Sequence, residues 1–501
     1  MAASNEKVVV LGGGMAGLTA AAYLARAGLD VELFEQHYRL GGCCTSFKRR
    51  QFVFDAAVHQ VGGCHPGGIL RAVFEDLGLW DRVEMRRADP MDVIISPRYH
   101  VPVWVDPERF LAALRENFPR EIDRLEKLVR FLFAFGPADF GRWGSATYRE
   151  LLDHFLEDEA AKTIFILPLG NIGISARRVG AITACTLWRE NQLNGGYAPK
   201  GSFQALPDAL GVRIEELGGK VHKRTEVSRI EVENGQVVGV HVRPMLAALG
   251  EERFIPCRHV IGAGAAPHIY LDLIDRVHVP AEYVERLETS EYSFSGIVVF
   301  LGLKGNVHER LPHHGCHWVL DEATPDAIDR WLEPEWTAQH MFEEQGPFYA
   351  AFPTGYDPEL APPGKSTAVL ILPGVHKSRA FWLEHKQRMA EVGVARLEKL
   401  LPGIASQVEL SYVAHSATIE YFTRNTRGAW YGWSMIPGQS NLKRLPRTGP
   451  VGGLHLAGHW TQPGPGVLNA VKSGELTAKS LLRALKKQAS AAAALGPHAL
   501  P

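Results

Sequence analysis

Four residues near the N-terminus have the types and the spacing of a phosphate-binding turn. Gly12, Gly14 and Gly17 follow the pattern G-x-G-x-x-G, and Glu35 lies 23 residues after the first of them. In that pattern the first glycine permits a tight turn, the second lets the backbone approach a pyrophosphate, and the third allows close helix packing. An acidic side chain about 20 residues further on accepts hydrogen bonds from ribose hydroxyls. The four residues therefore predict a dinucleotide site.

The elements that must position this turn are indicated by the flanking sequence. Residues 7–11 are a β-branched run typical of a strand, residues 18–27 are rich in Ala and Leu as in a helix, and residues 31–35 alternate like a second strand. The order strand, turn, helix, strand directs a helix N-terminus at the phosphates, where its partial positive charge stabilises them. These elements alone leave FAD and NAD both open.

The residues that follow resemble the FAD-binding segment of a known family. Gly41-Gly42 and residues 52–55 are similar to the extended FAD motif of the amine oxidase and phytoene desaturase superfamily. Further segments resemble, in the same order along the chain, the branch that contains phytoene desaturases, carotenoid isomerases and retinol saturases; they are 41–47, 54–59, 195–210, 225–227, 259–267, 357–365 and 453–467. The resemblance implies FAD as the cofactor. It places the following residues around it: Gly12, Gly14, Met15, Ala16, Gly17, Glu35, Gly41, Gly42, Cys43, Val227, Gly458, His459, Gly466 and Val467.

The C-terminal motif departs from this family branch at two positions. His459 stands where the branch usually has an acidic residue, and Pro465 stiffens the loop between Gly464 and Gly466. A neutral imidazole can still donate or accept a hydrogen bond there. The helix that follows would direct its N-terminus at the pyrimidine edge of the flavin, where its partial charge stabilises a reduced, anionic flavin.

A second nucleotide-binding unit, for a nicotinamide cofactor, is not expected. The only other candidate is Gly262-Ala-Gly264-Ala-Ala-Pro267, in which Pro267 occupies the third glycine position and no helix with an acidic residue in the expected context follows. This segment is better explained as a strand end that contacts FAD. We therefore predict no dedicated NAD(P) domain.

Three groups of residues are candidates for further chemistry. His59 matches a histidine of the retinol saturase pattern, and we predict it beside the flavin, either as a catalytic group or packed beneath the ring. Cys43 and Cys44 are expected near the ribityl chain without a redox role, because adjacent cysteines form only a strained disulfide. Residues 313–317 contain histidines and a cysteine, which can bind metal ions. No second cluster with the spacing of a zinc finger accompanies them, so we predict a polar loop and no metal site.

Residues 122–143 combine large apolar and basic side chains. Leucine and valine recur at helical spacing, Arg and Lys are interleaved, and Phe140 and Trp143 extend the apolar surface. Such a helix suits either a peripheral membrane contact or a core helix beside a substrate tunnel. Both alternatives fit a long apolar substrate, because a polyene or isoprenoid lipid requires an apolar tunnel that ends at the flavin.

The order of the motifs predicts an α/β fold with two interwoven domains. We expect a discontinuous Rossmann-type FAD-binding domain from residues 1–75, 195–290 and 445–485. An inserted mixed α+β substrate domain should come from residues 76–194 and 291–444, with a strand at 291–303 and a long helix at 381–401. Residues 486–501 are predicted to be a flexible tail.

Composition excludes some classes of protein and indicates a compartment. The chain has 501 residues, with 54 Lys and Arg against 55 Asp and Glu, and lacks the excess basic charge typical of nucleic-acid binding. Six cysteines do not suggest a disulfide scaffold. No run of 18 apolar residues and no secretory signal is evident. We therefore expect a cytoplasmic protein, with membrane association depending on residues 122–143.

The leading functional hypothesis is an FAD-dependent oxidoreductase or isomerase that acts on carbon–carbon bonds of a carotenoid, retinoid or similar apolar lipid. One alternative is a flavin amine oxidase for a small amine, although no aromatic cage is evident in the sequence. Another is a non-catalytic prenyl-binding protein like the Rab GDP-dissociation inhibitors. The intact glycine turn with Glu35 argues against the last of these.

Overall fold

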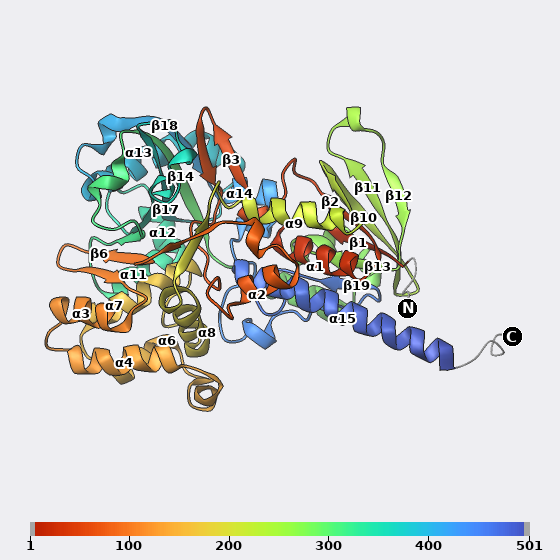
Figure 1. Ribbon diagram of the computed structural model, residues 1–501, viewed down its shortest axis with the longest axis horizontal. Helices are drawn as coiled ribbons and strands as arrows, with labels where there is room; N and C mark the ends of the chain where they lie inside the picture. The colour runs from red at the N-terminus through yellow and green to blue at the C-terminus, as the bar shows by residue number, and fades with distance from the viewer. Residues whose placement is uncertain (1–5, 495–501) are drawn as a thin grey trace.

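A parallel sheet of five strands carries the N-terminal glycine turn. In the computed structural model, which describes residues 6–494, this sheet has the order β19-β13-β1-β2-β9. The strands are β1 (Lys7–Leu11), β2 (Asp30–Glu35), β9 (Lys220–Lys223), β13 (His259–Gly262) and β19 (Leu454–Leu456). Helices α1 (Met15–Arg26), α9 (Ala205–Glu216) and α15 (Val467–Ala494) pack beside it (Figure 1). The predicted Rossmann-type fold is confirmed. The three valines of β1 are buried, and such β-branched runs are typical of parallel strands that are covered on both faces.

An antiparallel sheet of three strands covers one end of this parallel sheet. It consists of β10 (Thr225–Glu233), β11 (Gln236–Pro244) and β12 (Arg253–Pro256). In Figure 1 it rises from the side of the molecule opposite the larger sheet described next. Val227, one of the residues predicted around FAD, lies on its first strand and is therefore held by regular structure.

A mixed sheet of seven strands forms the second half of the molecule. Its order is β18-β14-β17-β16-β15-β6-β7, and β6 pairs parallel with β15 while the other neighbours pair antiparallel. The strands are β6 (Asp92–Ile95), β7 (His100–Val103), β14 (Ser295–Lys304), β15 (Cys316–Val319), β16 (Phe348–Ala351), β17 (Lys365–Gly374) and β18 (Val408–Ala414). The expected strand at 291–303 is β14, and the expected long helix is α13 (Arg379–Leu400).

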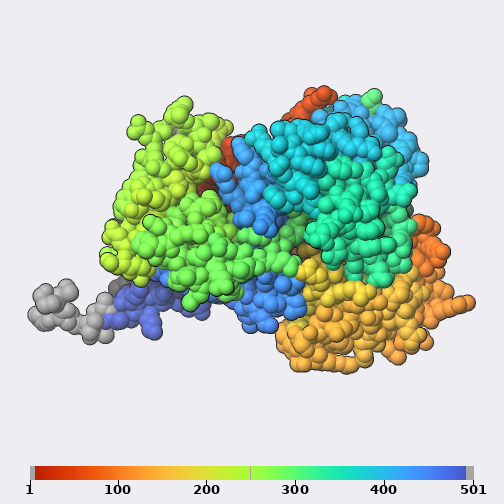
Figure 2. Space-filling view, turned by 180° about the vertical axis from the view of Figure 1, so that it is seen from behind, coloured from red at the N-terminus to blue at the C-terminus, as the bar shows by residue number. Residues whose placement is uncertain are grey.

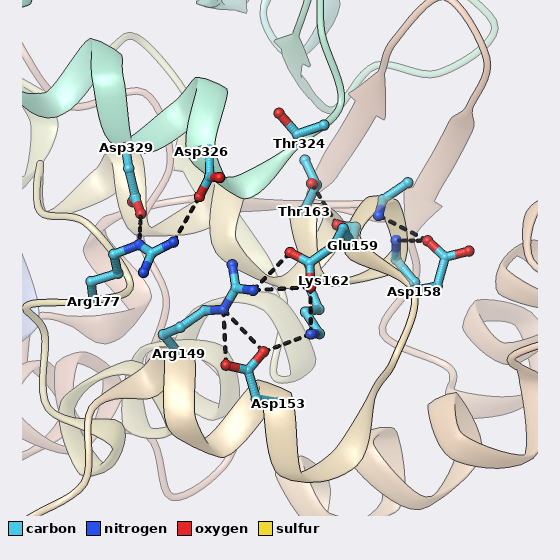
Figure 3. A network of polar contacts seen from close by, with 12 residues as sticks. Arg149, Asp153, Asp158, Glu159, Lys162, Thr163, Arg177, Thr324, Asp326 and Asp329 are labelled. Atoms are coloured by element: carbon cyan, nitrogen blue, oxygen red, sulfur yellow. Dashed lines mark hydrogen bonds and ion pairs between the residues drawn. The ribbon is translucent and has the colours of Figure 1, made fainter.

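Short helices between residues 107 and 187 form a helical lobe against this sheet. They are α3 (Pro107–Asn117), α4 (Ile122–Ala134), α5 (Phe140–Trp143), α6 (Tyr148–Phe155), α7 (Glu159–Ile166) and α8 (Ala181–Leu187). Figure 2 shows the lobe below residues 291–444. A network of ion pairs joins it to α11 (Pro325–Leu332), where Arg177 bonds both Asp326 and Asp329 (Figure 3).

The remaining helices and strands lie outside these three sheets and the helical lobe. They are β3 (Ser46–Arg49), β4 (Phe52–Asp55), α2 (Ile69–Asp76), β5 (Met85–Ala88), β8 (Gly196–Pro199), α10 (Ala281–Thr289), α12 (Pro334–His340) and α14 (Ser416–Thr423). The hairpin of β3 and β4 packs Phe52 and Phe54 against Phe300 of β14, although its residues belong to the segment predicted for FAD. The strands of the parallel sheet lie within the three predicted FAD segments, while the domain boundaries themselves stay a prediction.

The structure bears on two sequence-based expectations, the flexible tail at residues 486–501 and the helix within residues 122–143. Residues 486–494 continue α15 as a helix that projects from the body (Figure 1), so a flexible tail was wrong for them; residues 495–501 lie outside the described residues. In α4, Leu125, Leu128 and Leu132 are fully buried, which favours the core alternative over the membrane one. None of the helices in residues 6–494 combines the length and hydropathy that crossing a bilayer needs.

Candidate active site

A cavity at the carboxyl ends of β1, β2 and β13 collects most of the residues predicted for FAD. This nucleotide cavity is lined, among others, by Gly12, Gly14, Met15, Ala16, Glu35, Gly41, Gly42, Cys43, Val227, Gly458, His459, Gly466 and Val467. Ligands of open α/β sheets bind outside the carboxyl ends of the strands, so its place agrees with the fold. Segments more than 400 residues apart in the chain thus form one site.

The three glycines of the turn are required for different reasons. Gly12 has a φ of +100°, a left-handed conformation that favours glycine, and a Cβ on Gly17 would collide with the carbonyl oxygen of Gly12. A Cβ on Gly14 would instead meet no protein atom within 4 Å. Gly17 therefore does not line the cavity but allows α1 to pack against the turn, whereas Gly14 leaves room on the cavity side for a ligand.

Glu35 at the end of β2 fixes the turn. Its carboxylate accepts hydrogen bonds from the backbone N–H of Gly13 at 2.7 Å and of His37 at 2.8 Å. Burial raises the pKa of Glu35, and these two amide donors act in the opposite direction. Each carboxylate oxygen has a second lone pair, so the group can still accept hydrogen bonds from a ribose. The glycine turn and this acid fit the adenosine half of FAD.

His459, the departure from the family pattern, lies beside a buried arginine. Arg444 is 1% exposed and donates from Nε to the carbonyl oxygen of His459 at 2.6 Å. Burial, together with the charge of Arg444, lowers the pKa of His459 to about 3. The imidazole is therefore neutral at pH 7, where it lines the nucleotide cavity. Nothing in the sequence marks Arg444, because its partners come from other segments.

A second, larger cavity lies between the helical lobe and the seven-stranded sheet. This substrate cavity measures about 420 Å³ and has a mainly apolar lining that includes Leu167, Ile172, Leu187, Ile328, Leu332 and Phe348. Both cavities are lined by Ala57, Val58, Trp430, Tyr431, Gly466 and Val467. We call these six residues the shared wall. The two cavities therefore adjoin along these six residues.

Of the three groups considered for further chemistry, only His59 lies in the substrate cavity. It directly follows the shared-wall residue Val58, and burial lowers its pKa to about 4. Cys43 and Cys44 line the nucleotide cavity as free thiols. Cys316 and His317 belong to β15 and are buried, so only part of the predicted polar loop is a loop, and residues 6–494 hold no group of three potential metal ligands.

The glycine-rich segment after β13 also lines the nucleotide cavity. Ala263, Gly264 and Ala265 contribute to its wall directly beyond Gly262, the last residue of the strand. This is the arrangement expected for a strand end that contacts FAD. The absence of a dedicated NAD(P) domain stays a prediction.

Trp430 and Tyr431 were missed by sequence reasoning. Both lie in the shared wall, and their rings are inclined by 71° with centroids 6.4 Å apart. The two rings therefore do not form the parallel walls of an aromatic cage. They occur between α14 and β19, in a stretch without a recognisable motif, so no signal in the sequence marks them.

The fold and the paired cavities define a flavoprotein oxidoreductase. The model of the flavin-containing amine oxidoreductase family matches residues 15–482, and the chain belongs to that family. Its cofactor is FAD.

Similar proteins support this assignment. Human all-trans-retinol 13,14-reductase is 23% identical, over 90% of this chain and 81% of its own length. A zeta-carotene-forming phytoene desaturase from Myxococcus xanthus is 25% identical, over 96% of this chain and 95% of its own length. A solved structure of an oxidoreductase from Methanosarcina mazei has a TM-score of 0.68 at 19% identity, and the match covers 94% of this chain and all of the other.

Proposed function

We propose that this protein acts on a carbon–carbon bond of an apolar polyene or isoprenoid lipid, by desaturation, saturation or cis–trans isomerisation. The observation that carries this proposal is the substrate cavity, whose apolar walls meet the nucleotide cavity at six shared residues. An extended hydrocarbon chain could enter between the helical lobe and the seven-stranded sheet and reach the flavin through this wall.

Residues of both cavities have defined parts in such a reaction. The glycine turn, Glu35, Val227 and the loop 458–467 would hold FAD, which supplies hydride transfer when bound. Val58, Trp430 and Tyr431 would bound the reacting carbons with apolar surface and exclude water from them. The N-terminus of α15, which begins at Val467 in the shared wall, directs its partial positive charge toward this position.

Burial of apolar surface is the driving force that the substrate cavity offers. Its apolar side chains come from the helical lobe, from α11 and from the seven-stranded sheet. Each buried methylene of a ligand contributes about 0.8 kcal/mol, so a long hydrocarbon gains far more from such walls than a small amine does. The relatives named above act on a retinol and on a carotene precursor, which agrees with this preference.

The proposed function can be tested with the purified protein. Its visible spectrum should show bound flavin, and anaerobic incubation with cis and trans polyenes should convert at least one of them. A product of altered mass indicates a redox reaction, whereas unchanged mass with altered chromatographic retention indicates isomerisation. No conversion of any polyene or isoprenoid, combined with peroxide release from small amines, would show that the proposed substrate class is wrong.

A further inference from the structure

A third cavity lies between α3 and the hairpin of β6 and β7. This outer cavity measures about 650 Å³ and, within residues 6–494, shares no lining residue with the nucleotide cavity or the substrate cavity. Its walls come from residues 96–104, from α3 and from His313, which lies shortly before β15. Figure 1 shows α3 and β6 at the end of the molecule away from the parallel sheet. A ligand bound there therefore does not compete with FAD or with the proposed substrate for space.

Hydrogen bonds within the walls fix the shape of the outer cavity. Oγ of Ser96 accepts hydrogen bonds from the backbone N–H groups of Arg98 at 3.3 Å and of Tyr99 at 3.0 Å, which orders the turn before β7. At the C-terminal end of α3, Oδ1 of Asn117 accepts from the N–H of His100 at 3.2 Å, and Nδ2 donates to the carbonyl oxygen of His100 at 3.3 Å. Asn117 thus joins α3 to β7. The cavity is pre-formed, as sites for small molecules usually are.

Arg109 supplies unpaired positive charge to the outer cavity. Its guanidinium group lies over the ring of Trp104, with 3.5 Å between Cζ and the ring centroid, and no carboxylate within residues 6–494 forms an ion pair with it. A stacked guanidinium keeps its N–H donors in its own plane, where they can bind an anion through two parallel hydrogen bonds. Arg98 also lines the cavity without an ion pair in this part of the chain, whereas Glu116 is an acidic residue of the lining. The two arginines outweigh this carboxylate, so the lining is positively charged.

His313 lies close to Arg109 in this wall. The rings of His313 and Trp104 are inclined by 84° with centroids 5.3 Å apart, so the imidazole and the guanidinium group contact the same indole. Cζ of Arg109 and the centre of the imidazole are therefore at most about 9 Å apart, which one phosphate group can span because each of its hydrogen bonds is about 2.8 Å long. Arg109 and His313 can thus bind the same phosphate.

The histidines of the outer cavity are neutral at pH 7 and extend its aromatic lining. Burial lowers the pKa of both His100 and His313 below the ordinary value of 6.5, and the charge of Glu116 opposes this at His100. A neutral imidazole can donate one hydrogen bond to an anion. The two rings are inclined by only 9°, with centroids 5.9 Å apart. Together with Tyr99 and Trp104 they offer aromatic surface to a ligand.

Charge, volume and lining together select one class of ligand. A phosphate monoester carries a charge of about −1.5 to −2 at pH 7 and matches the planar donor fork of an arginine, whereas a carboxylate carries a single charge. An inorganic phosphate ion would leave most of the outer cavity unfilled, because cavities of about 300–1,000 Å³ accommodate drug-sized molecules. Aromatic side chains bind planar rings by stacking. A nucleotide combines a phosphate monoester with such a ring.

We propose that the outer cavity binds a nucleoside monophosphate, with the phosphate on Arg109 and His313 and the base on the aromatic lining. Arg98 adds to the positive charge that attracts the phosphate. This ligand is bound in addition to FAD and at a different place. The inference does not depend on the proposed function, since it concerns neither the flavin nor the lipid.

Calorimetric titration of the FAD-loaded protein tests the inference. AMP, adenosine and inorganic phosphate are each titrated at pH 7, and the flavin absorbance is followed in parallel. We expect AMP to bind at least about 10-fold more tightly than either adenosine or phosphate, because only AMP uses both the cationic and the aromatic part of the cavity. The flavin absorbance and the FAD content should stay unchanged, which distinguishes the outer cavity from the nucleotide cavity.

Variants locate the binding site. Arg109→Gln should weaken AMP binding about 10-fold or more, the effect of losing charge-assisted hydrogen bonds. Arg115→Gln is the matched control, because Arg115 is exposed on the same helix α3 but does not line the cavity, and its affinity for AMP should change by less than about 2-fold. Circular dichroism and flavin content show whether each variant is folded. Should Arg109→Gln not fold, the comparison of the three ligands on the unmodified protein still decides.

Three results would overturn the inference. AMP that binds no more tightly than phosphate shows that the cavity does not recognise a base. Equal losses in Arg109→Gln and Arg115→Gln show attraction by surface charge alone, and AMP binding that releases FAD places the ligand in the nucleotide cavity. Each of these results leaves the proposed function untouched, because conversion of polyenes tests that separately.

Discussion

The guanidinium group of Arg444 is bonded to the backbone carbonyl of His459, with 2.6 Å between Nε and the oxygen. The same group donates to the carbonyl oxygens of Tyr431, Trp433 and Gln439, and no carboxylate within residues 6–494 pairs with it. Burial lowers the pKa of Arg444 to about 9. A buried cation thus holds two backbone segments whose residues line the nucleotide cavity.

Replacing Arg444 should destabilise the protein and release its flavin. Arg444→Met leaves these carbonyl oxygens without their donor, and each buried acceptor left unbonded costs about 1–3 kcal/mol. Arg444→Lys should recover only part of this, because an ammonium group cannot reproduce the planar fork of donors. Urea unfolding and the ratio of flavin to protein absorbance check both effects. Unchanged stability and flavin content in Arg444→Met would contradict the role assigned to this side chain.

Gly14 and Gly17 should respond to alanine in opposite ways. Gly17→Ala forces a Cβ against the carbonyl of Gly12, and overpacking of this kind typically costs about 1–3 kcal/mol. Gly14→Ala meets no protein atom, so the apoprotein should fold as the unmodified one does. Its FAD dissociation constant should nevertheless rise at least about 10-fold, because the methyl group occupies the space of the pyrophosphate. Thermal unfolding of the apoproteins and fluorimetric FAD titration separate the two effects.

Two results would contradict the roles assigned to Gly14 and Gly17. If Gly14→Ala binds FAD normally while its fold is intact, the dinucleotide does not approach the turn at Gly14. If Gly17→Ala is as stable as the unmodified protein, the turn relaxes more easily than its geometry indicates.

The sequence was sufficient for the parallel sheet and for most of the nucleotide cavity. Gly12, Gly14 and Glu35 act through local backbone geometry, and local geometry leaves a pattern at fixed spacing. Arg444 and Asp92 leave no such pattern, since their partners lie in other segments and meet them only after folding. For the same reason, the basic and apolar pattern of residues 122–143 could not distinguish a membrane contact from core packing.

Asp55 should make the stability of the protein depend on pH. It is 5% exposed and accepts hydrogen bonds from Ser46 Oγ and from the backbone N–H of Phe203, and burial raises its pKa from 3.8 to about 6. The folded state therefore binds the proton more tightly than the unfolded state. The contribution of this group to the free energy of unfolding is fully present below pH 4 and falls by about 3 kcal/mol as pH rises through 6.

Asp55→Asn should remove this dependence while keeping an acceptor oxygen for both donors. The difference in free energy of unfolding between the variant and the unmodified protein should shift by about 3 kcal/mol in favour of the variant from pH 4 to pH 7. Asp92, whose pKa is also raised to about 6 by burial, titrates in both proteins and cancels in this difference. Urea unfolding at several pH values provides the data. Parallel stability profiles for the two proteins would show that Asp55 titrates at its ordinary pKa.

The ion-pair network of the helical lobe should divide into a strong and a weak part (Figure 3). The side chain of Lys162 is only 6% exposed, and its ammonium group bonds Asp153 and Glu159 at 2.6 Å each, whereas the side chain of Arg177, which bonds Asp326, is 56% exposed. Lys162→Met removes one of the two cations, the other being Arg149, that pair with Asp153 and Glu159, and should lower the free energy of unfolding by about 1–3 kcal/mol. Arg177→Ala should cost less than about 1 kcal/mol, because exposed ion pairs are screened by solvent. Urea unfolding in low and in 0.5 M salt checks both, with salt reducing mainly the effect of Arg177→Ala. A larger loss from Arg177→Ala than from Lys162→Met would show that the contact with α11, and not the pairing of α6 with α7, holds the lobe in place.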